Sequence, residues 1–174
     1  MSTTTEITIR SATTGDVGLI LAFIRELANY ERLSDLCVAT EDALRQTLFG
    51  PRPTAEVLLA DAGGAPAGFA LYFQNYSTFL ARPGLYLEDL FVRPAYRRLG
   101  VGRALLIELA AVAGDRGCGR FEWNVLDWNV DARRFYDSLG AVAMSEWMIY
   151  RLTGEALEAL ARDGRASRAE RGSR

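Results

Sequence analysis

Residues 87–106 have the sequence LEDLFVRPAYRRLGVGRALL, and this stretch decides the fold. Its first six residues are mostly apolar and predict a strand, while the residues from Val101 onward have helical spacing. Between them lies the turn Arg97-Arg98-Leu99-Gly100-Val101-Gly102. Glycine lets a backbone approach a ligand closely, and the following helix offers unpaired N–H groups and the positive end of its dipole. The stretch therefore predicts an anion site, with a pyrophosphate as the expected ligand.

Two common phosphate motifs do not fit this turn. A Walker A loop requires a lysine before Ser or Thr, and all 20 basic residues of this chain are arginines. The dinucleotide fingerprint requires a third glycine at the position of Leu105. A turn that needs glycines only for its shape, with arginines facing water, remains the alternative. The Arg-x-x-Gly-x-Gly spacing, with a strand before it and a helix after it, favours the phosphate site.

The turn resembles the pyrophosphate loop of the GNAT acetyltransferases, which has the pattern Arg/Gln-x-x-Gly-x-Gly/Ala and binds acetyl-CoA. Within this superfamily the chain resembles the diamine acetyltransferases, also called spermidine/spermine N-acetyltransferases, and most of all their thialysine-preferring branch. Besides the loop, the shared stretches are ELANYE at 26–31, LYLEDLFV at 85–92, LDWN at 126–129 and FY at 135–136. The resemblance covers about residues 6–160.

Composition excludes several kinds of chemistry. The chain has 174 residues, of which 49% are hydrophobic and 24% charged, as expected for one globular domain. It has no histidine, which removes Ser-His and Cys-His catalysis and His-ligated metals, and without lysine there is no Schiff base. Cys37 and Cys118 have no ligand spacing and are expected to be ordinary thiols. We expect no metal.

Charge points to a small cationic partner. The net charge is −2, although five arginines and only two acids fall in the last thirteen residues, so the remaining body is more acidic than the whole. An acidic body argues against nucleic acid and suits a cationic substrate. The N-terminus lacks the features of a signal peptide and no apolar run could span a membrane, so a cytoplasmic protein is expected.

The chain is expected to form one α/β domain at 6–161, between a disordered N-terminus at 1–5 and a basic, disordered tail at 162–174. The alternative for the tail is contact with an acidic partner. Expected strands lie at 7–10, 56–61, 68–76, 85–93, 119–126 and 144–152; expected helices start near Val17, Thr40, Val101, Asn129 and Thr153, and Thr13 and Asp16 form a capping box before the first of them. The resemblance implies a single-domain GNAT fold. Its mixed, mostly antiparallel sheet is flanked by helices and splayed at the acetyl-CoA site, between the strands that end near Val92 and Leu126.

Acetyl transfer to an amine needs a proton acceptor, because the amine arrives as an ammonium ion. With a pKa near 10.4, about one amine in 2,500 is free base at pH 7. Without histidine, carboxylates and tyrosines are the candidates. Glu88 and Asp89 are adjacent in an apolar strand, where alternation predicts opposite orientations. Charges that protect an edge strand from aggregation are the alternative, and the adjacent phosphate loop favours a functional pair.

The resemblance implies a role for each residue that matches the family pattern. Glu88 would accept the proton through water, and Tyr136 would donate one to the departing thiolate. By periodicity alone Tyr136 fits a core aromatic, and only the resemblance favours the acid. The backbone amides of residues 90–92 would contact the pantetheine arm. The implied coenzyme contacts are Leu90, Phe91, Val92, Arg97, Arg98, Leu99, Gly100, Val101, Gly102, Arg103, Asn129, Val130, Asp131, Ala132 and Tyr136.

The amine would lie among carboxylates, which attract a cation, and aromatic rings, which can hold one over their faces. The predicted lining is Tyr30, Glu31, Glu88, Asp89, Trp128 and Trp147. Trp128 and Trp147 fit core packing equally well.

The sequence thus predicts an N-acetyltransferase that moves the acetyl group of acetyl-CoA to a primary amine of a diamine, a polyamine or a thialysine-like diamino acid. The resemblance also implies a homodimer. The alternatives are a GNAT enzyme acting on protein N-termini or aminoglycosides, and a non-catalytic module that senses acetyl-CoA or a polyamine.

Overall fold

A five-stranded sheet in the order β1-β2-β3-β4-β5 organises the computed structural model, which describes residues 5–172. The strands are β1 (Ile7–Ser11), β2 (Glu56–Ala62), β3 (Ala65–Ser77), β4 (Arg82–Val92) and β5 (Phe121–Trp123). The first four pair antiparallel, and β4 pairs parallel with β5. The predicted α/β class with a mixed, mostly antiparallel sheet is therefore confirmed.

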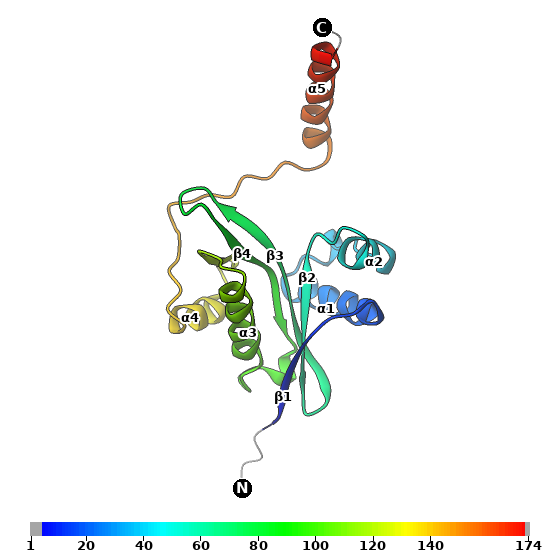
Figure 1. Ribbon diagram of the computed structural model, residues 1–174. Coiled ribbons are helices and arrows are strands. Elements are labelled where there is room, and N and C mark those ends of the chain that lie inside the picture. The colour runs from blue at the N-terminus through cyan, green and yellow to red at the C-terminus, as the bar shows by residue number, and fades with distance from the viewer. Residues whose placement is uncertain (1–4, 173–174) are drawn as a thin grey trace. The chain divides into compact units, whose positions relative to one another are not determined.

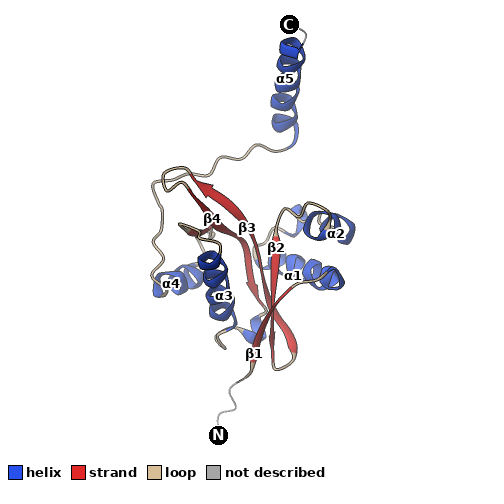
Figure 2. Cartoon of the chain, in the orientation of Figure 1, coloured by secondary structure: helices blue, strands red, loops and turns tan. Residues whose placement is uncertain are grey.

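Helices cover both faces of this sheet, with α1 and α2 on one side and α3 on the other (Figures 1 and 2). Their bounds are α1 (Val17–Tyr30), α2 (Glu41–Phe49) and α3 (Val101–Asp115), with short 3-10 turns η1 (Thr14–Asp16), η2 (Ser34–Leu36) and η3 (Pro94–Tyr96). The core between α1 and the sheet centres on Phe23, whose ring stacks on Phe69 at 5.4 Å between centroids and meets Phe91 edge-on at 6.4 Å. Helix α1 is thus joined to the β3–β4 hairpin at this point.

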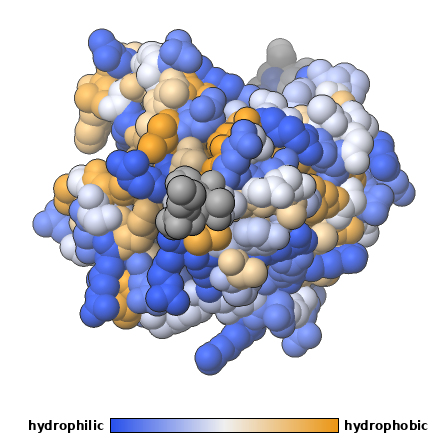
Figure 3. Space-filling view, turned by 90° about the horizontal axis from the view of Figure 1, so that it is seen from below, coloured by the Kyte–Doolittle hydropathy of each residue, from blue (hydrophilic) through white to orange (hydrophobic). Residues whose placement is uncertain are grey.

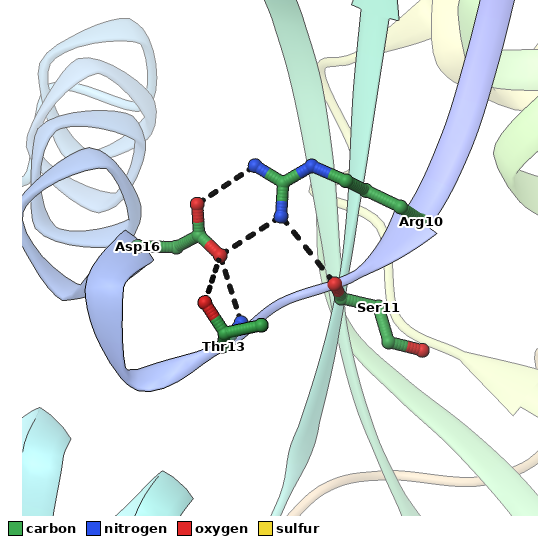
Figure 4. A network of polar contacts seen from close by, with 4 residues as sticks. All are labelled: Arg10, Ser11, Thr13 and Asp16. Atoms are coloured by element: carbon green, nitrogen blue, oxygen red, sulfur yellow. Dashed lines mark hydrogen bonds and ion pairs between the residues drawn. The ribbon is translucent and has the colours of Figure 1, made fainter.

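The start of α1 is fixed by the predicted capping box. Asp16 accepts hydrogen bonds from the Thr13 backbone N–H at 2.8 Å and from the Thr13 hydroxyl at 2.9 Å (Figure 4). Arg10 of β1 donates to both Asp16 oxygens, at 2.7 and 2.8 Å, and this ion pair holds the pKa of the Asp16 carboxyl well below its usual range. The box therefore caps the turn η1, which leads directly into α1, and the Arg10–Asp16 ion pair ties that turn to the first strand.

Residues 127–172 form a second compact unit, which is described by itself. It holds α4 (Val130–Ser138), capped by the Asn129 side chain, which accepts from the Ala132 N–H at 3.3 Å as the sequence predicts. It ends in α5 (Gly154–Gly172).

Three predicted boundaries are wrong. No strand forms at 144–152, which holds a turn at 145–146 and has no sheet partner, and Trp147 is 73% exposed. The strand expected at 119–126 is only the three residues of β5. The tail expected to be disordered from Arg162 continues α5 to Gly172, because alanine, arginine and glutamate favour helix. Residues 1–4 and 173–174 of the predicted termini lie outside the described residues.

One face of the molecule is mainly polar (Figure 3). Figure 3 shows charged and polar side chains over most of one face, with smaller apolar areas between them. Within residues 5–172, no helix has the length and apolar character needed to cross a membrane.

The stacked phenylalanines give a test of the core. Phe23 is fully buried and Phe79, at the tip of the β3–β4 hairpin, is 95% exposed. Phe23→Ala should lower the free energy of unfolding by about 3–5 kcal/mol, because it removes a large buried ring and leaves a cavity. Phe79→Ala, the same chemical change at an exposed site, should alter it by less than about 0.5 kcal/mol. Urea denaturation of both variants measures the difference, and equal effects would contradict the assigned core.

Candidate active site

Strand β4 has two neighbours along its first half and only one along its second. Its pairing with β3 continues to Val92, whereas its pairing with β5 covers only Leu85, Tyr86 and Leu87. From Glu88 to Val92, alternate backbone N–H and C=O groups therefore point toward the opening between β4 and β5. The predicted splay of the sheet is found here, and Leu90, Phe91 and Val92 lie along it.

A β-bulge interrupts β4 at the acidic pair. Leu71 of β3 is opposite Asp89, and the next residue, Tyr72, is opposite Leu87, so Glu88 has no partner of its own. A bulge locally breaks the alternation of side chains along a strand. Glu88 is exposed, while Asp89 is half-buried and lines a groove beside α1. The bulge thus gives the two carboxylates different surroundings.

The glycine turn leads from η3 into α3 through two residues of positive φ. Arg98 has φ +62° and Gly100 has φ +97°, the latter at the N-cap of α3. Val101 is buried, whereas Leu99 is 48% exposed. The turn is therefore anchored at its helical end and open on its outer side. The first N–H groups of a helix have no intrahelical partner, so this end of α3 suits an anion.

Two arginines near this turn are occupied by protein groups. Arg93 donates to both oxygens of Glu26, at 2.7 and 2.9 Å, and to the Pro66 carbonyl at 2.9 Å. The Arg97 guanidinium lies 4.5 Å from the ring centre of Tyr30, and its Nε donates to the Val92 carbonyl at 3.0 Å. Arg98 and Arg103 are exposed at the turn. Of the four arginines in this region, these two are the ones that face solvent.

An open groove of about 430 Å³ lies between the C-terminal half of α1, the segment that follows it and β4. Its lining is Ile24, Leu27, Ala28, Glu31, Leu33, Leu36, Cys37, Val38, Ala39 and Asp89. The walls are therefore largely aliphatic, with two carboxylates among them. Of the predicted amine-binding residues, the structure brings Glu31 and Asp89 together in this groove.

The groove makes a negative charge costly. Burial, followed by the negative charges of Glu88 and Glu31, raises the pKa of Asp89 to about 6. Burial also raises the pKa of Glu31. An ammonium group entering the groove would relieve both effects, because an opposite charge favours the ionised carboxylate. The electrostatics therefore favour a cation.

The apolar wall formed by Leu33, Leu36 and Cys37 was not predicted from the sequence. Leu36 and Val38 are strongly exposed, in the connection between α1 and α2. Apolar residues at 33, 36 and 38 in an otherwise polar connection were the available signal. Both cysteines are free thiols, as predicted.

The other predicted site residues belong to the second unit. Asn129, Val130, Asp131 and Ala132 form the start of α4, and burial raises the pKa of Tyr136 in the same helix to about 12. Trp128 and Trp147 are both exposed. That these residues meet the loop or the groove stays a prediction. Among residues 5–172, no group of three or more His, Cys, Asp or Glu side chains could hold a metal ion.

Known proteins resemble this chain in both sequence and structure. The model of the Acetyltransferase (GNAT) family matches residues 22–141. A thialysine N-epsilon-acetyltransferase of Bos taurus is 43% identical and covers 88% of this chain and 96% of its own length. L-ornithine N5-acetyltransferase NATA1 of Arabidopsis thaliana is 38% identical, covering 87% of this chain and 86% of its own. The solved structure of an integron cassette protein from the mobile metagenome of V. cholerae superposes with a TM-score of 0.74 at 28% identity, over 89% of this chain and 97% of that one.

The raised pKa of Asp89 predicts a specific dependence of stability on pH. The folded protein binds the Asp89 proton more tightly than the unfolded chain, whose pKa is near 3.8, so this carboxyl costs stability as pH rises from about 4 through 6. Asp89→Asn should therefore raise the free energy of unfolding at pH 7, by on the order of 2 kcal/mol, and should change it little at pH 4. Urea denaturation at both pH values measures this. Asp35→Asn, which removes an exposed carboxylate, is the control, and a gain for Asp89→Asn that is equal at the two pH values would contradict the assignment.

Proposed function

The chain belongs to the GNAT acetyltransferase family and is an N-acetyltransferase like those of the diamine acetyltransferase subgroup; we propose that its acceptor is a primary amine of a small cationic molecule, a diamine, a polyamine or a thialysine-like diamino acid. The acyl donor is acetyl-CoA, the substrate of this family. Two relatives are named for thialysine and ornithine, which both carry an amine at the end of a short chain.

One observation carries the choice of acceptor. Glu31 and Asp89 lie in an open groove beside β4, the same strand whose end leads into the glycine turn. Aliphatic walls suit the carbon chain of such an amine, and the two carboxylates suit its ammonium groups. This pairing of an acidic, apolar groove with an anion-binding turn is what a transfer from acetyl-CoA to a cationic amine requires.

The glycine turn fits the diphosphate of acetyl-CoA. Its exposed arginines, Arg98 and Arg103, carry charge, and the N–H groups of the first turn of α3 can donate to phosphate oxygens. Gly100 at φ +97° keeps this path open without a side chain. The backbone of 90–92, on the open edge of β4, would hold the pantetheine arm, and one of its N–H groups would stabilise the thioester oxygen as it gains negative charge.

Transfer then proceeds by direct attack. The amine loses a proton to Glu88, through water, and its nitrogen attacks the thioester carbonyl carbon. As the C–S bond breaks, the thiolate takes a proton from Tyr136. The attacking nitrogen gives up its second proton as the amide forms, which restores the tyrosine through water, and Glu88 releases its proton to solvent. A tyrosine phenol is protonated at neutral pH, as a donor requires, and burial raises the pKa of Tyr136 further, to about 12. Asp89 and Glu31, together with Tyr30, Trp128 and Trp147, bind the cation. Asn129 to Ala132 at the start of α4 provide further coenzyme contacts.

We also propose that the protein is a homodimer. The irregular segment 144–152 carries exposed Met148, Ile149 and Tyr150 and has no strand partner. Such a run suits burial against a second copy. Sedimentation equilibrium should give twice the 19.2 kDa mass of the chain.

An amine screen tests the proposed function. Release of CoA thiol from acetyl-CoA should be fastest with diamines, polyamines or thialysine, and slow with aminoglycosides and with peptides that present a free N-terminus. If aminoglycosides or peptides are the faster substrates, the proposed class of acceptor is wrong. Binding of acetyl-CoA without turnover of any amine would favour a sensing module instead.

Gly100→Val should abolish acetyl-CoA binding. The side chain would be strained at φ +97° and would occupy the path to the diphosphate. Gly117→Val is the matched control, because Gly117 also has positive φ, at +64°, and lies beyond the other end of α3. Calorimetry should give parent-like affinity for the control and at least a tenfold loss for Gly100→Val, about 1.4 kcal/mol. Retained affinity in a folded Gly100→Val protein would remove the assigned diphosphate site.

Glu88→Gln should lose turnover mainly at neutral pH. An amide cannot accept a proton, and a higher pH supplies free amine directly, so the rate should partly recover as pH rises. Asp89→Asn should instead raise the KM for the amine. Rate profiles from pH 6 to 10 separate the two roles, and a Glu88→Gln profile that overlays the parent would exclude Glu88 as the base.

Tyr136→Phe should slow acetyl transfer while leaving the fold and coenzyme affinity intact, because only the hydroxyl is lost. General acid catalysis contributes about 10²–10⁴-fold, so a drop of at least about tenfold is expected. Single-turnover measurements at saturating acetyl-CoA exclude slow product release. A parent-like rate would return Tyr136 to the role of a packing aromatic.

A further inference from the structure

Two arginines that flank the 3-10 turn η3 dock on one face of α1. The Arg93 guanidinium lies 4.6 Å from the ring centre of Phe23 and forms the ion pair with Glu26. The Arg97 guanidinium lies on Tyr30, seven residues after Phe23. Positions 23, 26 and 30 share one side of a helix. The segment between β4 and the glycine turn is thus held to α1 at two levels.

The Arg97 contact joins the glycine turn to the amine groove. Arg97 is the first residue of the turn, and its Nε also fixes the Val92 carbonyl at the end of β4. Tyr30 is the last residue of α1, and the next residue, Glu31, lines the groove with Asp89. The Arg97 side chain, itself part of the turn, therefore contacts both the end of β4 and the last residue of α1. The groove carboxylate Glu31 follows that residue directly.

The side chain of Arg97 already makes several contacts with protein groups. Its guanidinium carbon lies over the Tyr30 ring and 5.9 Å from the ring centre of Phe91, and its Nε donates to the Val92 carbonyl. Arg98 and Arg103 are exposed and supply the charge at the turn. A guanidinium that stacks and donates at once fixes the relative orientation of its two partners, which a flexible ammonium group does not.

We propose that Arg97 is a positioning residue that couples the acetyl-CoA turn to the amine groove. It holds Tyr30, and with it the last turn of α1 and Glu31, in register with residues 97–103. This rests on the proposed function. Occupation of the turn by a diphosphate orders the segment that carries Arg97 and so raises the affinity of the groove for the amine. Such a coupling is reciprocal for binding affinities, so the amine in turn tightens the coenzyme.

A double-mutant cycle tests the coupling. Arg97→Met keeps the aliphatic stem, and Tyr30→Leu keeps an apolar side chain without a ring. Each should raise the amine KM about three- to tenfold at saturating acetyl-CoA. Because the two substitutions remove the same contact, the KM of the double variant should not exceed that of the more impaired single variant. Arg97→Lys retains charge without the planar stack and should stay impaired.

Arg98→Met is the matched comparison at the next residue. It should weaken CoA, with an effect that shrinks as salt rises, and leave the amine KM unchanged. Arg97→Met should show the reverse pattern. If Arg97→Met instead weakens CoA with the same dependence on salt and leaves the amine KM at the parent value, Arg97 is a phosphate ligand and the proposal is overturned.

Hydrogen exchange separates this proposal from the proposed function. In the parent protein, CoA should slow the exchange of amides at 27–33, and in Arg97→Met that protection should be lost while CoA still binds. Equal protection in both proteins would overturn the coupling even if turnover is normal. If the parent acetylates no amine, the proposed function fails, and the exchange result still decides the role of Arg97.

Discussion

The loss of one sheet neighbour along β4 is the constraint on which the rest of this structure depends. β5 accompanies β4 only as far as Leu87, so the last five residues of the strand keep backbone groups that no second strand covers. Unpaired backbone in a protein interior is costly, and a strand edge of this kind needs a ligand or a covering element. The bulge at Glu88 gives the two carboxylates of this edge different surroundings. The Arg97 contact beyond Val92 holds the segment that leads into the glycine turn.

The fold could be predicted wherever the signal was local. The Thr13–Asp16 box, the hairpin across Gly63 and Gly64 and the helix after Gly100 each depend on residues within a few positions of one another, and each is found. The strand expected at 144–152 fails because a strand needs a partner, and alternating apolar residues do not say which one. The charge of residues 162–174 suggests a disordered tail, although their alanines and arginines also favour a helix, which continues to Gly172.

The site was predictable to a similar degree. The glycine turn has a sequence pattern of its own, and Glu31 and Asp89 do meet in one groove. The alternation of residues along β4 did not reveal the bulge, because the bulge is a shift in the pairing of β4 with β3. That shift gives Glu88 and Asp89 their different exposure. Nor could sequence show that Arg97 lies on Tyr30, because 67 residues and three strands separate them. Contacts of that kind depend on the completed fold.

The ion pairs of residues 5–172 are built from arginine, since the chain has no lysine, and this matters for a protein that handles an acetyl donor. At neutral pH a small fraction of lysine side chains is deprotonated and nucleophilic. Acetylation of such an amine would remove its charge and break its ion pair. A guanidinium stays protonated and is a poor nucleophile. The contacts that hold β1, β4 and α3 in place are therefore chemically inert toward the protein's own substrate, and self-modification of side-chain amines is ruled out by composition.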